Sequence, residues 1–192
     1  GDTVIYADWN SIRDTLDYDF ATEKQFTYDG LTVERAVRHL SKFASGIWQI
    51  HPFCEGNTRA TAVFMIKYLK TFGFRVNNDI FKEYSWYFRN ALVRANYKKF
   101  EKNIFEDITF LEKFFYNLLS NTNYELKNRY MHIDYVQSAN DSISKCSACT
   151  LEEQVIINII KDNPTVKQEE IASMINKSLR TIKSRMIEMQ EK

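Results

Sequence analysis

The segment His51-Pro52-Phe53-Cys54-Glu55-Gly56-Asn57-Thr58-Arg59 lies between two stretches with helical patterns and decides how the chain folds around it. Before it, apolar residues recur at helical spacing from Thr32 to Trp48, and Thr32 is the expected N-cap. This helix should end near His51, because the residue before a proline avoids helical backbone. After the segment, a second helix is predicted from Asn57 to Phe72, where Gly73 stops it. The segment therefore forms a corner between two helices.

The corner has the residue types of a phosphate-binding loop. Gly56 permits a turn that directs successive amides into one concavity, and the following helix adds its free N–H groups and the positive end of its dipole. Arg59 can bind phosphate oxygens through two parallel hydrogen bonds. Glu55 would repel a bare phosphate, but a Mg²⁺ ion between the two removes the repulsion. The corner therefore predicts a site for a phosphate and a divalent cation.

His51 completes this chemistry, because an imidazole can take a proton from an incoming hydroxyl at neutral pH. Pro52 would keep the backbone extended, and Phe53 would anchor the loop in the core. A base, a metal carboxylate, an anion site and an arginine together indicate transfer of a phosphorus-centred group. The alternative is a purely structural corner, in which Asn57 caps a helix and His51 is satisfied within the core.

The remaining patterns predict an all-α fold. A helix is expected over residues 9–20, capped by Asn10 or Ser11. Two more are expected over residues 78–96 and 106–120, and their aromatic stripes are typical of a buried core rather than of a cofactor site.

Composition excludes several classes of protein. The 192 residues are 44% hydrophobic, so wholesale disorder is excluded, and the length suggests one domain with a small appendage. With 26 Lys and Arg against 25 Asp and Glu, the chain is not built wholly to bind nucleic acid. The sequence has no run of about 18 apolar residues and no secretion signal, which favours a cytoplasmic protein. Cys146 and Cys149 form a lone C-x-x-C, either two linker thiols or part of a metal site.

The small polar residues 137–150 have the composition of a linker between a domain at 1–136 and a module at 151–192. The module resembles a winged helix-turn-helix, with a short helix, a tight break and a second short helix. Its candidate DNA-binding residues are Ser178, Arg180, Thr181, Lys183 and Arg185. Because the module has as many acidic as basic residues, a protein-interaction role is an equal alternative.

The corner resembles the signature of the Fic (Fic/Doc) family, usually written H-P-F-x-(D/E)-G-N-(G/K)-R. The residues that match are His51, Pro52, Phe53, Glu55, Gly56, Asn57 and Arg59. The order of helices over roughly residues 1–120 is similar to the all-α core of that family. The resemblance implies AMP transfer from Mg·ATP to a Ser, Thr or Tyr hydroxyl of a target protein or of the chain itself. Dimers are frequent in the family, so a homodimer is a further expectation.

The same resemblance assigns roles to residues. It makes His51 the general base and Glu55 the ligand of Mg²⁺ between the α- and β-phosphates. The expected nucleotide-binding residues are Gly56, Asn57, Thr58, Arg59, Arg89 and Asn96. In this set, Arg59 would bind the departing pyrophosphate, and the last two would contact the nucleoside.

Thr3, Val4, Ile5 and Tyr6 are β-branched or aromatic and predict a short strand ending at Ala7, with no nearby partner. The strand resembles one strand of the family's flap, whose edge holds a target segment by backbone pairing. Its partner strand would precede residue 1, so we expect that the domain begins upstream of this chain.

Thr58 departs from the Gly or Lys of the family pattern. A Lys there marks the Doc-like kinases, so its absence favours AMP transfer over phosphoryl transfer. Two alternatives remain open. One is a DNA-binding regulator whose Fic core only senses nucleotide, and the other is a Fic enzyme that transfers a different nucleotide or a phosphoryl group. The intact pair of His51 and Arg59 favours an enzyme.

Overall fold

The computed structural model describes residues 4–76, 78–120, 122–133 and 149–190, and these residues form helices and loops without a strand. The α-helices are α1 (Ile12–Gln25), α2 (Val33–Ile50), α3 (Asn57–Thr71), α4 (Asp79–Glu83), α5 (Ser85–Asn96), α6 (Thr109–Ser120), α7 (Leu151–Asp162), α8 (Gln168–Met174) and α9 (Leu179–Gln190). Two short 3-10 helices are η1 (Phe100–Lys102) and η2 (Asn128–Met131). The all-α prediction is confirmed for this part of the chain. None of its helices is long and apolar enough to cross a membrane.

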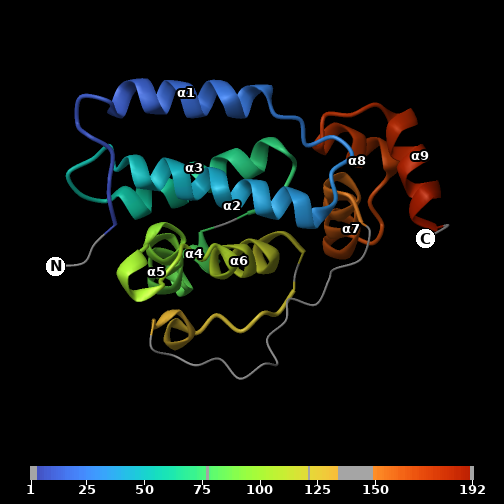
Figure 1. Ribbon diagram of the computed structural model, residues 1–192. Coiled ribbons are helices and arrows are strands. Elements are labelled where there is room, and N and C mark those ends of the chain that lie inside the picture. The colour runs from blue at the N-terminus through green and yellow to red at the C-terminus, as the bar shows by residue number, and fades with distance from the viewer. Residues whose placement is uncertain (1–3, 77, 121, 134–148, 191–192) are drawn as a thin grey trace.

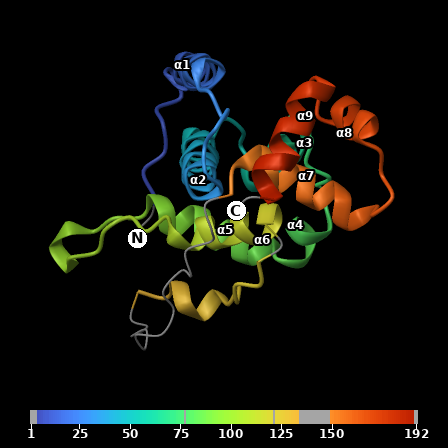
Figure 2. The ribbon, with the colours of Figure 1, turned by 90° about the vertical axis from the view of Figure 1, so that its right-hand side faces the viewer.

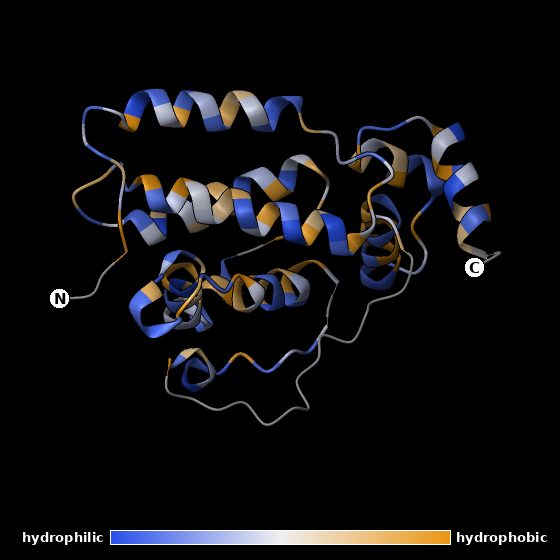
Figure 3. Cartoon of the chain, viewed as in Figure 1, coloured by the Kyte–Doolittle hydropathy of each residue, from blue (hydrophilic) through white to orange (hydrophobic). Residues whose placement is uncertain are grey.

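Helix α2 lies at the centre of the core. Figure 1 shows α1 on one side of α2 and α5 and α6 on the other, and α3 also packs on it. The apolar residues of α2 are excluded from solvent, as at Ala36, Leu40 and Ala44, and burial of one leucine side chain contributes about 1.5–3 kcal/mol. Figure 3 shows hydrophobic segments, in orange, alternating with hydrophilic ones along the packed helices. The end of α2 that leads into the corner is therefore held in place by its neighbours.

The predicted ends of α2 and α3 are confirmed. Thr32 is the N-cap of α2, and its side chain accepts a hydrogen bond from the Arg35 N–H at 3.3 Å. The capping expected for the first helix is wrong. The Ser11 hydroxyl precedes α1 but donates to the Asp8 carbonyl at 2.9 Å, so it does not cap the helix.

The single helix predicted over residues 78–96 is broken at Tyr84, which separates α4 from α5. One aromatic ring from each of the two helices packs against α6. The rings of Phe81 and Phe88 lie 5.0 and 4.9 Å from that of Phe114 on α6, measured between centroids. Packing of both rings against α6 therefore accounts for the bend.

Residues 4–8 do not form the predicted strand, and Thr3 lies outside the described residues. A strand requires a second backbone segment to pair with, and these residues contact a helix instead. The Gln49 side-chain amide of α2 donates to the Ile5 carbonyl at 3.1 Å, and the Ala7 N–H approaches the Gln49 carbonyl at 3.4 Å. The segment runs along the end of α2, next to the corner.

The C-terminal helices pack against the rest of the molecule. The backbone joins the two parts where the Val33 N–H donates to the Cys149 carbonyl and the Leu151 N–H to the Leu31 carbonyl, each at 3.0 Å. Helix α7 also contacts α2 and α6, and Figure 2 shows α7, α8 and α9 gathered on one side of the core. A capping box at Thr150 starts α7 at this junction.

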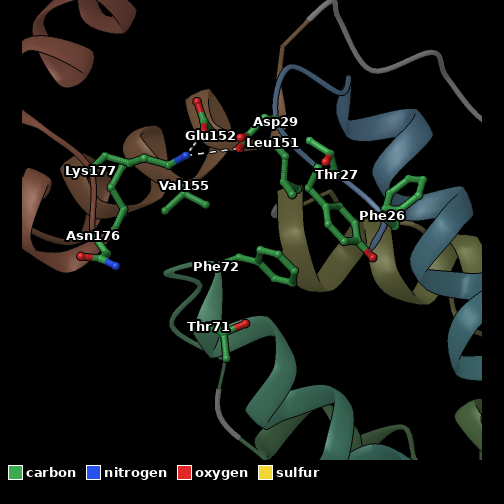
Figure 4. A pocket seen from close by; sticks show the side chains of 12 residues that line it. Phe26, Thr27, Asp29, Thr71, Phe72, Leu151, Glu152, Val155, Asn176 and Lys177 are labelled. Carbon is green, nitrogen blue, oxygen red and sulfur yellow. Dashed lines mark hydrogen bonds and ion pairs between the residues drawn. The ribbon is translucent and has the colours of Figure 1, made fainter. Parts of the chain in front are cut away.

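A cavity of about 420 Å³ lies in this junction (Figure 4). Lys177, from the turn between α8 and α9, lies 3.2 Å from the Asp29 carboxylate and 3.0 Å from that of Glu152. The aromatic rings of Phe26 and Phe72 line the opposite wall. The three charged groups thus connect the α1–α2 loop, the start of α7 and the α8–α9 turn.

Candidate functional site

His51 ends α2 in a left-handed conformation, with φ 56° and ψ 53°, so the extended backbone expected before Pro52 is wrong. This left-handed conformation costs a non-glycine residue about 1–3 kcal/mol and is retained where the surroundings over-determine it. The backbone N–H of His51 donates to the Trp48 carbonyl at 3.2 Å. The imidazole lies 4.0 Å from the Tyr6 ring and meets the Trp48 ring edge-on at 5.9 Å, measured between centroids. Two aromatic residues therefore hold the ring of the predicted base.

The two nitrogens of the His51 ring differ in their surroundings. Nδ1 is buried and has no hydrogen-bond partner among the described residues. Because Nδ1 is enclosed by protein, an incoming group could approach the ring only from the side of Nε2. Ring orientation in His51 thus depends on packing, since no hydrogen bond to Nδ1 fixes it.

Asn57 fixes the corner. Its side chain is 4% exposed, its Oδ1 accepts from the Phe53 N–H at 3.0 Å, and its Nδ2 donates to the Phe53 carbonyl at 2.6 Å. The expectation that Phe53 anchors the loop in the core is wrong, because that side chain is 55% exposed. The polar side chain of Asn57 anchors the loop instead, by satisfying both backbone groups of one loop residue.

The N-terminus of α3 is open. Gly56 is the N-cap of α3 and has a φ of 80°. Because glycine has no side chain, no cap accepts a hydrogen bond from the first N–H groups of the helix. The first turn of α3 contains Arg59 and no acidic residue. Free N–H groups, the positive end of a helix dipole and a cation at one point are the features that favour an anion, so this is the candidate anion site.

Glu55 and Arg59 are exposed, and within the described residues neither forms an ion pair or a side-chain hydrogen bond. A Cβ built on Gly56 would lie 3.5 Å from Nη2 of Arg59, so the guanidinium lies beside the start of α3. Both side chains remain available to a ligand at the open helix end.

Thr58 lines, with Arg59, a cavity of about 300 Å³ beside the first turn of α3, and its hydroxyl also bonds across the corner. Its Oγ1 accepts a hydrogen bond at 3.0 Å from Nε1 of Trp48, whose ring is 3% exposed. The sequence reasoning missed this role for both residues. The signal that could have found it is a buried indole three residues before His51, which needs an acceptor.

A second opening of about 490 Å³ adjoins the corner through Tyr6, which lines the cavity and contacts the His51 ring. Arg89 lines it too, and its guanidinium lies 5.8 Å from the centroid of the Trp86 ring. Asn96 is committed elsewhere, because its amide donates to Ser45 Oγ and the Leu92 carbonyl, each at 2.8 Å. The structure therefore places Arg89 at a cavity and leaves only the side-chain oxygen of Asn96 for a ligand.

Within the described residues, no three His, Cys, Asp or Glu side chains come together as a metal cluster. A cation at Glu55 would need further ligands from a bound phosphate. Cys54 is a free, exposed thiol, and Cys146 lies outside the described residues, so the interpretation of the C-x-x-C stays a prediction.

The candidate DNA-binding residues of α9 separate into two groups. Ser178 accepts a hydrogen bond from the Thr181 N–H at 3.2 Å and caps the helix, and Arg185 pairs with Glu152 at 3.4 Å and Glu188 at 2.8 Å. Arg180 and Lys183 are exposed and have no ion-pair partner among the described residues.

Residues 6–69 match the model of the Fic/DOC family. No curated protein and no solved structure matches the chain. The matched range contains α1, α2, the corner from His51 to Arg59 and most of α3. The match thus falls on the part of the fold that contains the predicted base and the candidate anion site.

Proposed function

We propose that this chain transfers AMP from ATP to a hydroxyl side chain of a target protein, with Mg²⁺ as the metal ion. The observation that carries the proposal is the corner between α2 and α3. A histidine held in left-handed backbone lies there beside a helix N-terminus that no side chain caps. A base next to an anion site is the minimum that attack of a hydroxyl on a phosphate requires.

The corner fits a magnesium-bound triphosphate. The first N–H groups of α3 would bind phosphate oxygens, and Gly56 lets the ligand approach the backbone without a Cβ in the way. Arg59 would bind a terminal phosphate with its guanidinium. Glu55 would hold Mg²⁺, which supplies the positive charge that makes a carboxylate and phosphates compatible.

His51 would take the proton of the incoming hydroxyl on Nε2, since Nδ1 is buried. The acceptor is a Ser, Thr or Tyr of another protein or of this chain. Ile5, at 74% exposure, is the surface residue of the segment before α1 on which we expect a target segment to bind, whereas Val4 is buried at 4%. Arg89 would contact the nucleoside from the cavity beside Tyr6.

The position of a radioactive label tests the reaction class. The protein is incubated with Mg²⁺ and with ATP labelled at either the α- or the γ-phosphate, in the presence of a cell extract as a source of targets. Label on protein from α-labelled ATP alone supports AMP transfer. Label from γ-labelled ATP alone would establish a phosphoryl transfer instead. Transfer from α-labelled UTP or GTP in preference to ATP would identify that nucleotide as the donor in place of ATP.

A nucleic-acid surface on α9 is a second candidate function, which a specific observation favours. Arg180 and Lys183 are three positions apart, so they share one face of the helix, and both are exposed without an ion-pair partner in the described part of the chain. Free cations on one helix face are what phosphate contacts require. This activity would accompany the transfer reaction rather than replace it.

A further inference from the structure

Three aromatic rings pack around the predicted base. The Trp48 ring lies 5.7 Å from that of Tyr6 at an interplanar angle of 70°, and both contact the His51 ring. The two neighbours of the imidazole differ in burial, since Trp48 is 3% and Tyr6 is 37% exposed. Tyr6 comes from the irregular segment before α1, whereas Trp48 belongs to the last turn of α2. Trp48 is therefore the fixed wall of the histidine site.

The indole of Trp48 is itself held by one hydrogen bond, from Nε1 to Thr58 Oγ1 at 3.0 Å. This bond joins the last turn of α2 to the first turn of α3 across the corner. This hydrogen bond thus connects Thr58, next to the candidate anion site, to the indole ring that supports His51.

We propose that Thr58 and Trp48 are positioning residues for His51, with the Thr58 hydroxyl fixing the indole and the indole fixing the imidazole. The consequence for catalysis rests on the proposed function of His51 as the base. The need for such a device follows from the buried Nδ1, which has no hydrogen-bond partner in the described residues. A catalytic histidine is commonly oriented through its second nitrogen, and here packing must do so.

The side chain at position 58 is suited to this role. A glycine there would offer no acceptor to the indole, and a lysine ammonium is a donor without an acceptor lone pair. Threonine accepts the bond and keeps its backbone N–H at the start of α3. The departure from the Gly or Lys of the Fic signature therefore has a structural explanation in Trp48.

The experiment compares Thr58→Val, which keeps the branched shape and removes the acceptor, with Thr58→Ser, which keeps the hydroxyl. NMR follows the indole N–H of Trp48, assigned by its loss in Trp48→Phe, and the ring C–H signals of His51. In Thr58→Val we expect the indole proton to move upfield and the His51 signals to shift. Thr58→Ser should restore both. Thr71→Val, which removes a hydroxyl at the other end of α3, is the matched control and should change neither.

Kinetics supply the second arm. Misplacement of a base lowers kcat by about tenfold to a hundredfold, whereas the KM for ATP should stay within about twofold, because the backbone N–H of residue 58 is retained. His51 signals in Thr58→Val that equal those of the wild type would overturn the proposal. Unchanged kcat in Thr58→Val would overturn it as well. If the wild type transfers no nucleotide at all, the proposed function fails, and the NMR comparison still decides whether Thr58 and Trp48 position His51.

Discussion

At the scale of single residues, the corner depends on backbone conformations that ordinary residues avoid. His51 and Gly56 both have positive φ, at 56° and 80°, and they flank the loop on either side. Packing against Tyr6 and Trp48 offsets the backbone strain at His51. Gly56 has no side chain to cap α3, so the N-terminus of that helix stays open. The site is therefore sensitive to side chains that the sequence motif does not contain.

Gly56→Ala tests the conformation of the loop. A left-handed alanine costs about 1–2 kcal/mol, so stability should fall. ATP affinity should fall as well, because a Cβ would stand where a phosphate approaches the backbone. Calorimetric titration with Mg·ATP and thermal unfolding measure the two effects. Gly46→Ala is the control, because Gly46 lies within α2 and its Cβ would meet Asp19 at an ordinary 3.5 Å. That variant should be neutral or up to about 1 kcal/mol more stable.

At the scale of helices, a buried carboxylate ties α1 to α2 and α3. Glu23 of α1 is 6% exposed, accepts hydrogen bonds from the Tyr28 and Tyr68 hydroxyls, and lies 2.6 Å from Nε2 of His39. The His39 ring in turn stacks on Phe26 with 3.4 Å between centroids. This cluster lies at the opposite end of α2 from the corner and fixes how α1 and α3 lie along it.

The cluster predicts a loss of stability in alkali. Burial, and then the hydrogen bond to Glu23, raise the pKa of the Tyr28 and Tyr68 hydroxyls above the ordinary value of about 10. A group whose folded-state pKa is raised stabilises the fold below its unfolded pKa, and the contribution is lost as the pH rises above about 10. Urea unfolding between pH 8 and 11 should show this loss, and Tyr28→Phe should make the slope shallower. An equal slope in Tyr28→Phe would contradict the assignment.

The exposed cations of α9 predict salt-dependent DNA binding. Arg180→Ala and Lys183→Ala should each weaken retention on a DNA duplex. Each should also make the fall of the logarithm of the binding constant with the logarithm of salt concentration shallower, by the amount that one lost phosphate contact causes. Arg13→Ala, which removes an exposed cation of α1, is the control and should leave retention unchanged. Retention that is the same in all three variants would reject α9 as a nucleic-acid surface and favour a protein-interaction role.

At the scale of the whole molecule, α7 shares its core with α2 and α6, which predicts one cooperative unfolding transition. Ile156 of α7 is fully buried, so Ile156→Ala should cost about 2–5 kcal/mol and lower the melting temperature of the entire protein. Ile187→Ala on α9, at 57% exposure, should change stability by less than about 0.5 kcal/mol. Scanning calorimetry that resolved two transitions, with only one shifted by Ile156→Ala, would show that the C-terminal helices unfold as a separate unit.

The sequence predicts the parts of the fold that depend on local signals. The cap at Thr32, the end of α2 before Pro52 and the stop at Gly73 all follow from the conformations that these residues allow. The break at Tyr84 depends on aromatic contacts with α6, a distant segment that periodicity does not include. A strand at residues 4–7 would need a pairing partner, which local propensity cannot supply.

The candidate site divides in the same way. The motif indicates the base, the glycine and the arginine, because each acts through its own residue type. The anchoring by Asn57 and the bond from Trp48 to Thr58 depend on how two helices meet, so they are seen only when α2 and α3 are in place. Phe53 shows that residue type alone can mislead, because this aromatic residue of the loop is exposed rather than buried.

The role of His51 as the base of a nucleotidyl transfer is tested most directly by labelling of protein with α-labelled ATP, by the wild type and by His51→Asn. Asparagine tolerates left-handed backbone better than most residues, so the corner should keep its conformation while the base is lost. We expect label with the wild type and a loss of about a hundredfold or more in the variant. Equal labelling by the two proteins would show that His51 is not the base.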